Sequence, residues 1–160
     1  MALDVTNVQG SKIYLVPQDA TLTTATDIAT AISTGAQINC LQAIGDITET
    51  KNVQEYTCIS GDESAKSIGS STRGNQNIET LFSAADAAGQ AEMTDMWDNN
   101  TRRRLVVVFP DQITPSTGNP TYLHYEVFPS SRTWGMPKDG AIMFNYVLEM
   151  ASSVSYIKAT

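Results

Sequence analysis

Short segments in which apolar and polar residues alternate recur along this chain, and they constrain its fold more than any other feature. The clearest is 141–150, AIMFNYVLEM, where a large apolar side chain occupies every second position from Ile142 to Met150. A period of two places those side chains on one face of a β-strand. Successive segments are joined mostly by turns too short to hold a crossover helix, which favours antiparallel pairing. The sequence therefore predicts a mainly β protein, an antiparallel β-sandwich or squashed barrel.

The alternating segments give about seven or eight strands in all. The chain has 160 residues, which suits a single domain over 1–160, and residues 1–10 are expected to be a flexible N-terminal arm. The segment 105–109 is apolar on both faces, so it needs cover on both sides, from a helix or from a neighbouring subunit. The predicted strands are 11–16, 37–44, 52–59, 75–82, 104–109, 122–128 and 141–150, with 154–158 extending the last.

Residues 59–74 are predicted to be a long loop between two of these strands. Their sequence, ISGDESAKSIGSSTRG, is polar and contains three glycines and five serines. Loops longer than about 12 residues are uncommon in compact domains and tend to be functional or mobile. We therefore expect this loop to become ordered only when it contacts a partner.

One flanking α-helix is predicted over about residues 84–97, AADAAGQAEMTDMW. Ser83 suits the N-cap position, and Asp86 completes a capping-box pattern three residues later. A shorter helix is expected over 26–34. The long helix should face the core along one stripe, formed by Ala85, Gly89, Met93, Met96 and Trp97.

The charge balance argues against a protein that grips nucleic acid. Seventeen acidic and ten basic residues give a formal net charge of −7, whereas a phosphate-binding surface must be basic. No segment has the ~18 apolar residues of a membrane helix, and the N-terminus lacks the pattern of a secretory signal. Cys40 and Cys58 lack the spacing of a zinc site. Reduced, partly buried thiols are favoured for them, and a disulfide between neighbouring strands is the alternative.

No constellation for catalysis or cofactor binding is apparent. His124 is the single histidine, and no G-x-S-x-G motif supplies a nucleophile for it, so a solvated or interface histidine is expected. The stretch 60–67, SGDESAKS, lacks both glycines of a phosphate-binding loop. The acidic residues between 46 and 63 lack the spacing of a calcium-binding loop. We predict a non-enzymatic protein without cofactor or metal.

Two stretches resemble the major tail, or tail tube, proteins of long-tailed bacteriophages with non-contractile tails. Residues 82–111, FSAADAAGQAEMTDMWDNNTRRRLVVVFPD, give a small-residue helix followed by an arginine-led strand. Residues 121–154, TYLHYEVFPSSRTWGMPKDGAIMFNYVLEMASSV, give two long strands with an Asp-Gly turn before the last. The polar insertion at 59–74 also fits such proteins.

The resemblance implies a structural virion protein, assembled in the host cytoplasm, whose copies form hexameric rings with a continuous β-barrel as the inner wall. Stacked rings would make a hollow tube for the genome. The implied partners are other copies of the chain, tape-measure and tail terminator proteins, and double-stranded DNA in transient, non-specific passage, with no membrane insertion. A wet, acidic bore would repel the passing polyanion.

Arg102, Arg103 and Arg104 follow directly on a helix that carries Asp95 and Asp98. A net-negative protein with no other basic cluster is a poor host for a DNA grip. We therefore expect these arginines to pair with carboxylates within or between subunits. Solvated side chains and a DNA contact are the alternatives.

Two further sets of charged residues are candidates for assembly and for the bore. The 59–74 loop brings four residues to the expected ring interface: Asp62, Glu63, Lys66 and Arg73. The acidic region upstream of it is expected to be a solvated surface or, as the sharper alternative, a surface facing DNA. Its lumen-facing candidates are Asp46, Glu49 and Glu55.

Two alternative functions stay open at this point. Another ring-forming tail component, such as a tail completion, terminator or baseplate protein, would form one ring and stop. A sugar-binding β-sandwich would need exposed aromatic residues at a shallow groove, for which Tyr122 and Trp134 are the candidates.

Overall fold

The computed structural model describes residues 10–57, 64–86, 88–111 and 118–160. Every strand pair within these residues is antiparallel, which confirms the predicted mainly β, antiparallel class. Nearly all of the N-terminal arm expected at 1–10 lies outside them. The elements in order are β1 (Lys12–Pro17), α1 (Ala25–Thr34), β2 (Ala36–Gln37), β3 (Leu41–Ile44), β4 (Glu49–Thr57), β5 (Ser64–Arg73), β6 (Asn75–Leu81), α2 (Gly89–Asn99), β7 (Arg103–Val108), β8 (Tyr122–Gly135), β9 (Met143–Met150) and β10 (Ser155–Ile157).

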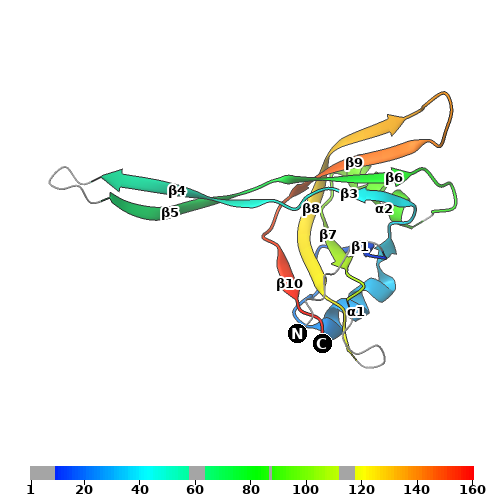
Figure 1. The fold of residues 1–160 in the computed structure, drawn as a ribbon. Coiled ribbons are helices and arrows are strands. Elements are labelled where there is room, and N and C mark those ends of the chain that lie inside the picture. The colour runs from blue at the N-terminus through cyan, green and yellow to red at the C-terminus, as the bar shows by residue number, and fades with distance from the viewer. Residues whose placement is uncertain (1–9, 58–63, 87, 112–117) are drawn as a thin grey trace, which may run out of the picture.

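Eight strands form one sheet in the order β2-β1-β7-β8-β9-β6-β3, and β10 pairs with β8 (Figure 1). The long strand β8 serves both halves of this sheet. Its first half pairs with β7, and its second half pairs with β9 from Val127 to Gly135. The predicted extension of the last strand over 154–158 is wrong: the chain leaves β9 at Ala151 and returns as the separate strand β10, opposite Tyr122–His124.

The helix α2 covers one face of the sheet, but it starts later than predicted. Asp86 accepts hydrogen bonds from the backbone N–H groups of Gly89 (3.0 Å) and Gln90 (3.3 Å), so it satisfies free donors at the helix start. The expected N-cap role of Ser83 is therefore wrong, and Ala85 is exposed. The rest of the stripe holds, with Gly89, Met93 and Met96 buried and Trp97 packed at the edge of the core.

Gly89 explains why the helix can begin so close to the sheet. A Cβ atom at this position would lie 2.2 Å from the carbonyl oxygen of Gln37 and 2.5 Å from the Cα of Ile38. Real Cβ atoms do not approach backbone so closely. Glycine is thus required where the first turn of α2 contacts the chain between β2 and β3.

The helix α1 covers the other face of β1, β7 and β8. It starts with a capping box in which the Thr24 hydroxyl accepts from the Asp27 N–H (3.1 Å), while Asp27 accepts from the Thr24 N–H (3.0 Å). Its buried Ile28 belongs to a second core with Val16, Leu22, Val106 and Tyr122. The second helix expected over 26–34 is therefore confirmed.

Strand β7 lies between these two cores. Leu105 and Val107 point into the core under α2, while Val106 points into the core under α1. Their exposed fractions are 0, 2 and 0% respectively. The apolar faces at 105–109 are thus largely covered by helices of the same chain, and they give no reason to require a neighbouring subunit.

The predicted loop at 59–74 is wrong over most of its length. Ser64–Arg73 is the strand β5, which pairs with β4 from Glu49↔Arg73 to Thr57↔Ser64, with one register shift between Lys51 and Val53. Residues 59–63 lie outside the described residues. The predicted strand over 37–44 is also interrupted, because Cys40 has a left-handed backbone conformation (φ 55°) between β2 and β3. Cys40 is also exposed rather than partly buried.

Candidate functional site

The strands β4 and β5 form an arm, defined here as 49–57 and 64–73, that projects from the sheet as a separate two-stranded ribbon (Figure 1). Every residue of both strands is exposed. A two-stranded hairpin alone is marginally stable in water at best, and its outer edges offer unpaired N–H and C=O groups. The arm is therefore the part of the described chain that gains most from a partner.

The charged residues of the arm are placed at its base and along one face. At the base, the Glu49 carboxylate accepts from the Val154 N–H (3.1 Å), and Arg73 donates to the Ser153 hydroxyl (3.1 Å). Further out, Lys66 and Glu55 approach to 3.9 Å and are both more than half exposed. Two of the predicted ring-interface residues, Lys66 and Arg73, thus lie on the arm. The other two, Asp62 and Glu63, lie outside the described residues.

The arm also exposes three large apolar side chains. Val53 and Ile68 are cross-strand partners, so they stand side by side on one face of the ribbon, with Glu55 and Lys66 next to them on that face. Tyr56 lies on the opposite face. Their exposed fractions of 55–70% are far above those of apolar residues in the two cores. Such residues on a free ribbon indicate a contact surface.

The three consecutive arginines bond within the chain. Arg103 forms ion pairs with Glu92 and, at 3.5 Å, with Asp95, both on α2. Arg102 lies 3.4 Å from Glu126 and stacks over the Phe128 ring at 5.5 Å. Arg104 instead donates to the backbone carbonyl of Gln18 (2.9 Å). The expected carboxylate pairing therefore occurs inside the subunit for two of them, and Arg104 departs from it.

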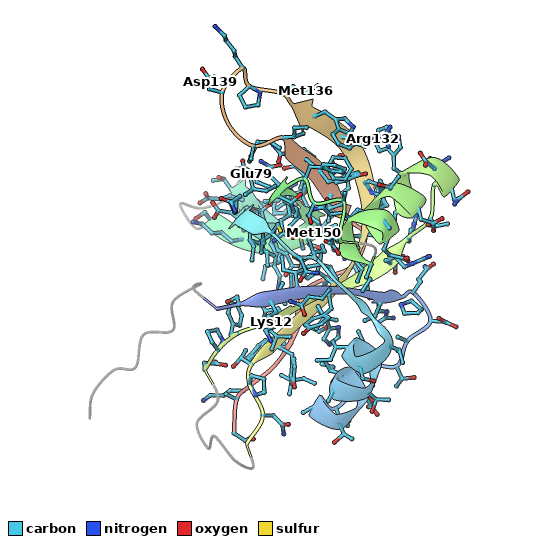
Figure 2. The ribbon with its side chains drawn as sticks, turned by 90° about the vertical axis from the view of Figure 1, so that its right-hand side faces the viewer. Lys12, Glu79, Arg132, Met136, Asp139 and Met150 are labelled. Atoms are coloured by element: carbon cyan, nitrogen blue, oxygen red, sulfur yellow. The ribbon has the colours of Figure 1, made fainter. Side chains whose placement is uncertain are left out.

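A polar face lies on the side of β6, β9 and the second half of β8 that is turned away from α2. Figure 2 shows Glu79 on one side of this sheet and Arg132 on the other, towards α2. Alternation and register place no lysine or arginine among the outward residues of these strands. These outward residues are Asn75, Asn77, Glu79, Leu81, Met143, Asn145, Val147, Glu149, Phe128, Ser131, Thr133 and Gly135.

The sequence-predicted acidic candidates lie near this face but outside its three strands. Asp46 is exposed between β3 and β4, Glu49 is at the base of the arm, and Glu55 is far out on the arm. Glu79 and Glu149 were not singled out from sequence. Strand alternation shows that they face outward, but only the structure shows that both helices pack elsewhere.

Two edges of the sheet that carries the polar face are open within the described part of the chain. Strand β3 pairs with β6 on one side and ends the strand order on the other. The second half of β8 pairs with β9 on one side. On its other side the pairing with β7 ends at Val127, so the residues after Val127 have no partner strand there. A four-stranded unit, β3-β6-β9-β8, therefore has a free edge at each end.

His124 is buried within the subunit, which excludes the solvated position of the two expected, solvated or interface. It lies on β8 under the segment that leads to α1 and against β10. Burial lowers the pKa of its imidazole, and the nearby Arg104 guanidinium lowers it further. Burial raises the pKa of Tyr125, which donates a hydrogen bond to Gln76 inside the main core. These groups are structural, and no pair of them forms an arrangement for catalysis.

The residues that the structure describes hold neither a metal-binding cluster nor a membrane-spanning helix. These residues contain no group of three or more His, Cys, Asp or Glu side chains placed to hold a metal ion. Neither α1 nor α2 has the length and apolar character needed to cross a bilayer.

Solved structures match this fold over almost the whole chain. The SPP1 tail tube aligns with a TM-score of 0.66 over 95% of this chain and 78% of that one, at 13% identity. A chain of the anti-feeding prophage baseplate aligns with 0.70 over 99% and 98%, at 9% identity. A chain of a sheath/tube terminator complex from an extracellular contractile injection system, PVC, aligns with 0.67 over 98% and 99%, at 12% identity. The fold is that of tail tube proteins.

The resemblance of 82–111 and 121–154 to tail tube proteins is thus confirmed for the fold of the subunit. No family model and no curated protein matches the sequence. The likeness at 9–13% identity therefore concerns the fold, shared by proteins of tail tube, baseplate and tube terminator.

Proposed function

We propose that this chain is a structural, non-enzymatic subunit of a phage-type tail, whose copies assemble into hexameric rings that stack into a hollow tube. The tail-tube fold supports the class of protein. The observation that carries self-assembly is the arm, 49–57 and 64–73, which is exposed along its whole length. Ordered, uncovered strands with apolar side chains are what a subunit offers to another copy.

The open edges support closure into a ring. The edge of β3 in one copy would pair with the second half of β8 in the next, so that the β3-β6-β9-β8 units join into a continuous barrel. This joins two different edges, which is a heterologous contact, and such contacts generate rings when the rotation closes. Closure would remove both free edges.

The polar face would then line the bore. Its amide, hydroxyl and carboxylate groups keep water, and its strands give passing phosphates no lysine or arginine. The Arg102 guanidinium, which lies over Phe128 at one end of the face, is paired with Glu126. We place Glu79 and Glu149 at this surface. Asp46, Glu49 and Glu55 stay predictions, and Glu55 is the weakest of them because it is paired with Lys66 on the arm.

The further partners follow from this role. A tube of this kind carries double-stranded DNA in transient, non-specific passage, contacts a tape-measure protein inside and a terminator at its end, and resides in the virion after assembly in the host cytoplasm. Arg102 and Arg103 act inside the subunit, because Arg102 is paired with Glu126 on β8 and Arg103 is paired with α2. Their effect on a neighbouring copy is therefore indirect, through the positions of β8 and α2.

A second candidate, a tail terminator or baseplate ring, is favoured by the matches to the baseplate and terminator complexes. Such a protein would stop at one ring. The sugar-binding alternative needs Tyr122 and Trp134 to be exposed in one groove. Tyr122 is buried under α1, and Trp134 lies near the far end of β8, so the two do not form such a groove.

The test is a concentration series of the purified chain by sedimentation velocity and negative-stain electron microscopy. We expect rings and stacked tubes as the concentration rises. A variant in which a short Gly-Ser turn replaces 51–71 should stay a folded monomer, with an unchanged thermal unfolding midpoint, because the arm packs on neither core. A wild-type protein that stays monomeric throughout would refute the proposal, and single rings would favour the terminator or baseplate role.

A further inference from the structure

Large exposed apolar side chains gather at two places in the described chain. Three are on the arm: Val53, Tyr56 and Ile68. Four are at the far end of β6, β8 and β9. Only Tyr156, on β10, lies apart from both groups. The far-end group, called the aromatic tip below, consists of Phe82 (43% exposed), Trp134 (43%), Met136 (74%) and Ile142 (43%).

The aromatic side chains of the tip are held in place by packing against one another. The Trp134 ring lies 5.4 Å from that of Phe82 and 4.1 Å from that of the buried Phe144, so its position is fixed by stacking. Between these rings and α2 is a hollow of about 390 Å³, lined also by Gln90, Ala91 and Thr94. Pockets for small molecules have volumes from about 300 to 1,000 Å³, so the hollow has room for more than one side chain.

The arm and the aromatic tip lie at opposite ends of the same strands. The arm continues β6 beyond Asn75, opposite Glu149, whereas the tip begins after Leu81, opposite Met143. Figure 1 shows the arm extending to one side of the sheet and the β8–β9 end to the other. Figure 2 shows Met136 and Asp139 on a turn that points away from the side where α1 lies.

The charges next to the two surfaces are complementary. On the arm, Glu55 and Lys66 stand beside the Val53–Ile68 pair. On the tip, the turn after Met136 carries Lys138 and Asp139. The arm also carries Lys51, two residues from Val53, and Asp86 also lines the hollow. Both surfaces therefore have charged groups of each sign next to an apolar patch, and these can pair with their opposites.

The area of the arm shows whether one arm contact is enough to hold two copies together. Ten residues of strand extend about 33 Å, and two strands are about 10 Å wide, so one face covers roughly 330 Å². A stable interface takes about 800 Å² from each partner. One arm face is thus too small by itself. The arm contact would therefore act together with the β3–β8 edge pairing proposed above, each subunit giving one arm and receiving another.

From these observations we infer that the aromatic tip is the receptor for the arm of a second copy, with Val53 and Ile68 entering the hollow beside Phe82 and Trp134. This inference rests on the proposed self-assembly and names the surface through which it occurs. The contact is head-to-tail, because donor and receptor are on opposite ends of one subunit. It therefore propagates from copy to copy.

Tryptophan fluorescence tests this contact directly. The chain has two tryptophans, so the variant Trp97→Phe leaves Trp134 as the sole reporter. On assembly we expect the Trp134 emission to shift to shorter wavelength and its acrylamide quenching to fall several-fold, because the arm displaces water from the hollow. Introducing Ile68→Asp into this background should abolish both changes and the tubes.

A matched control is Tyr156→Asp, since Tyr156 is as exposed as Ile68 but belongs to neither surface. It should leave assembly and the fluorescence change intact. Tubes that form while Trp134 stays fully quenchable would overturn the receptor assignment and leave the proposed tube function standing. A Tyr156→Asp variant that blocks assembly as strongly as Ile68→Asp would also overturn it. Far-UV circular dichroism of each variant excludes misfolding as the cause.

Discussion

Two antiparallel ladders in this protein have the same hydrogen-bond pattern and opposite surroundings. The β7–β8 ladder is covered by α2 on one face and approached by α1 on the other, so its central residues are buried. The β4–β5 ladder has water on both faces along its whole length. The contrast shows that the faces of the β7–β8 ladder are covered by helices of the same chain, whereas nothing in the described chain covers the arm.

The largest expected effect comes from truncating one apolar residue in each ladder. Leu105→Ala leaves a cavity in the main core and should lower the free energy of unfolding by about 2–5 kcal/mol. Ile68→Ala on the arm should change it by less than about 0.5 kcal/mol in the monomer, because Ile68 is exposed. Urea unfolding of both monomeric variants measures this. Equal losses would mean that the arm is packed in the free subunit.

A smaller effect is expected from reversing one charge in each region. Arg103→Glu removes the ion pairs to Glu92 and Asp95 and sets three carboxylates together, which should cost about 1–2 kcal/mol at this half-buried position. Its matched control, Lys66→Glu, breaks an exposed 3.9 Å pair on the arm and should cost less than about 0.5 kcal/mol. Thermal unfolding in low and high salt compares them. An unchanged midpoint for Arg103→Glu would exclude a stabilising role for this pair.

The smallest expected effect is a pH dependence of stability, and it comes from His124 in the main sheet rather than from the arm. The native pKa of His124 is lowered from 6.5, so below pH 6.5 the unfolded chain binds a proton that the folded chain does not. Stability should therefore fall as the pH drops from 6.5 towards the native pKa. In the His124→Gln variant the thermal unfolding midpoint should change less with pH between 6.5 and the native pKa of His124. A slope that persists in the variant would assign the dependence to other groups.

Sequence alternation predicted the main sheet well because most of its strands have one buried face, although β7 has two. The faces of Met143–Met150 are those predicted, with Phe144, Tyr146, Leu148 and Met150 inside. Ile142, predicted on the same inward face, precedes the strand and is exposed. The same reasoning failed for β5, where SAKSIGSSTR contains one large apolar residue and has the composition of a loop. Its pairing with β4, rather than burial, makes it a strand, and such pairing leaves no period in the sequence.

The candidate site was predictable only in part, for a related reason. The carboxylate partners of Arg103 could be expected from the neighbouring acidic helix, whereas the partner of Arg102, Glu126, is on β8. The polar face with Glu79 and Glu149, and the aromatic tip, depend on which strands adjoin and where the helices stop. Likewise, Asp86 rather than Ser83 bonds the first N–H groups of α2, because the helix begins only at Gly89.

The base of the arm has a mechanical consequence. Its direction is held by bonds from Glu49 and Arg73 to the short segment at 153–154, where β9 ends and β10 has not yet begun. Two polar links act as a pivot, and a pivot yields to torque more readily than interlocked side chains do. A filament joined through such arms would owe its bending compliance to these links, while each subunit stays rigid.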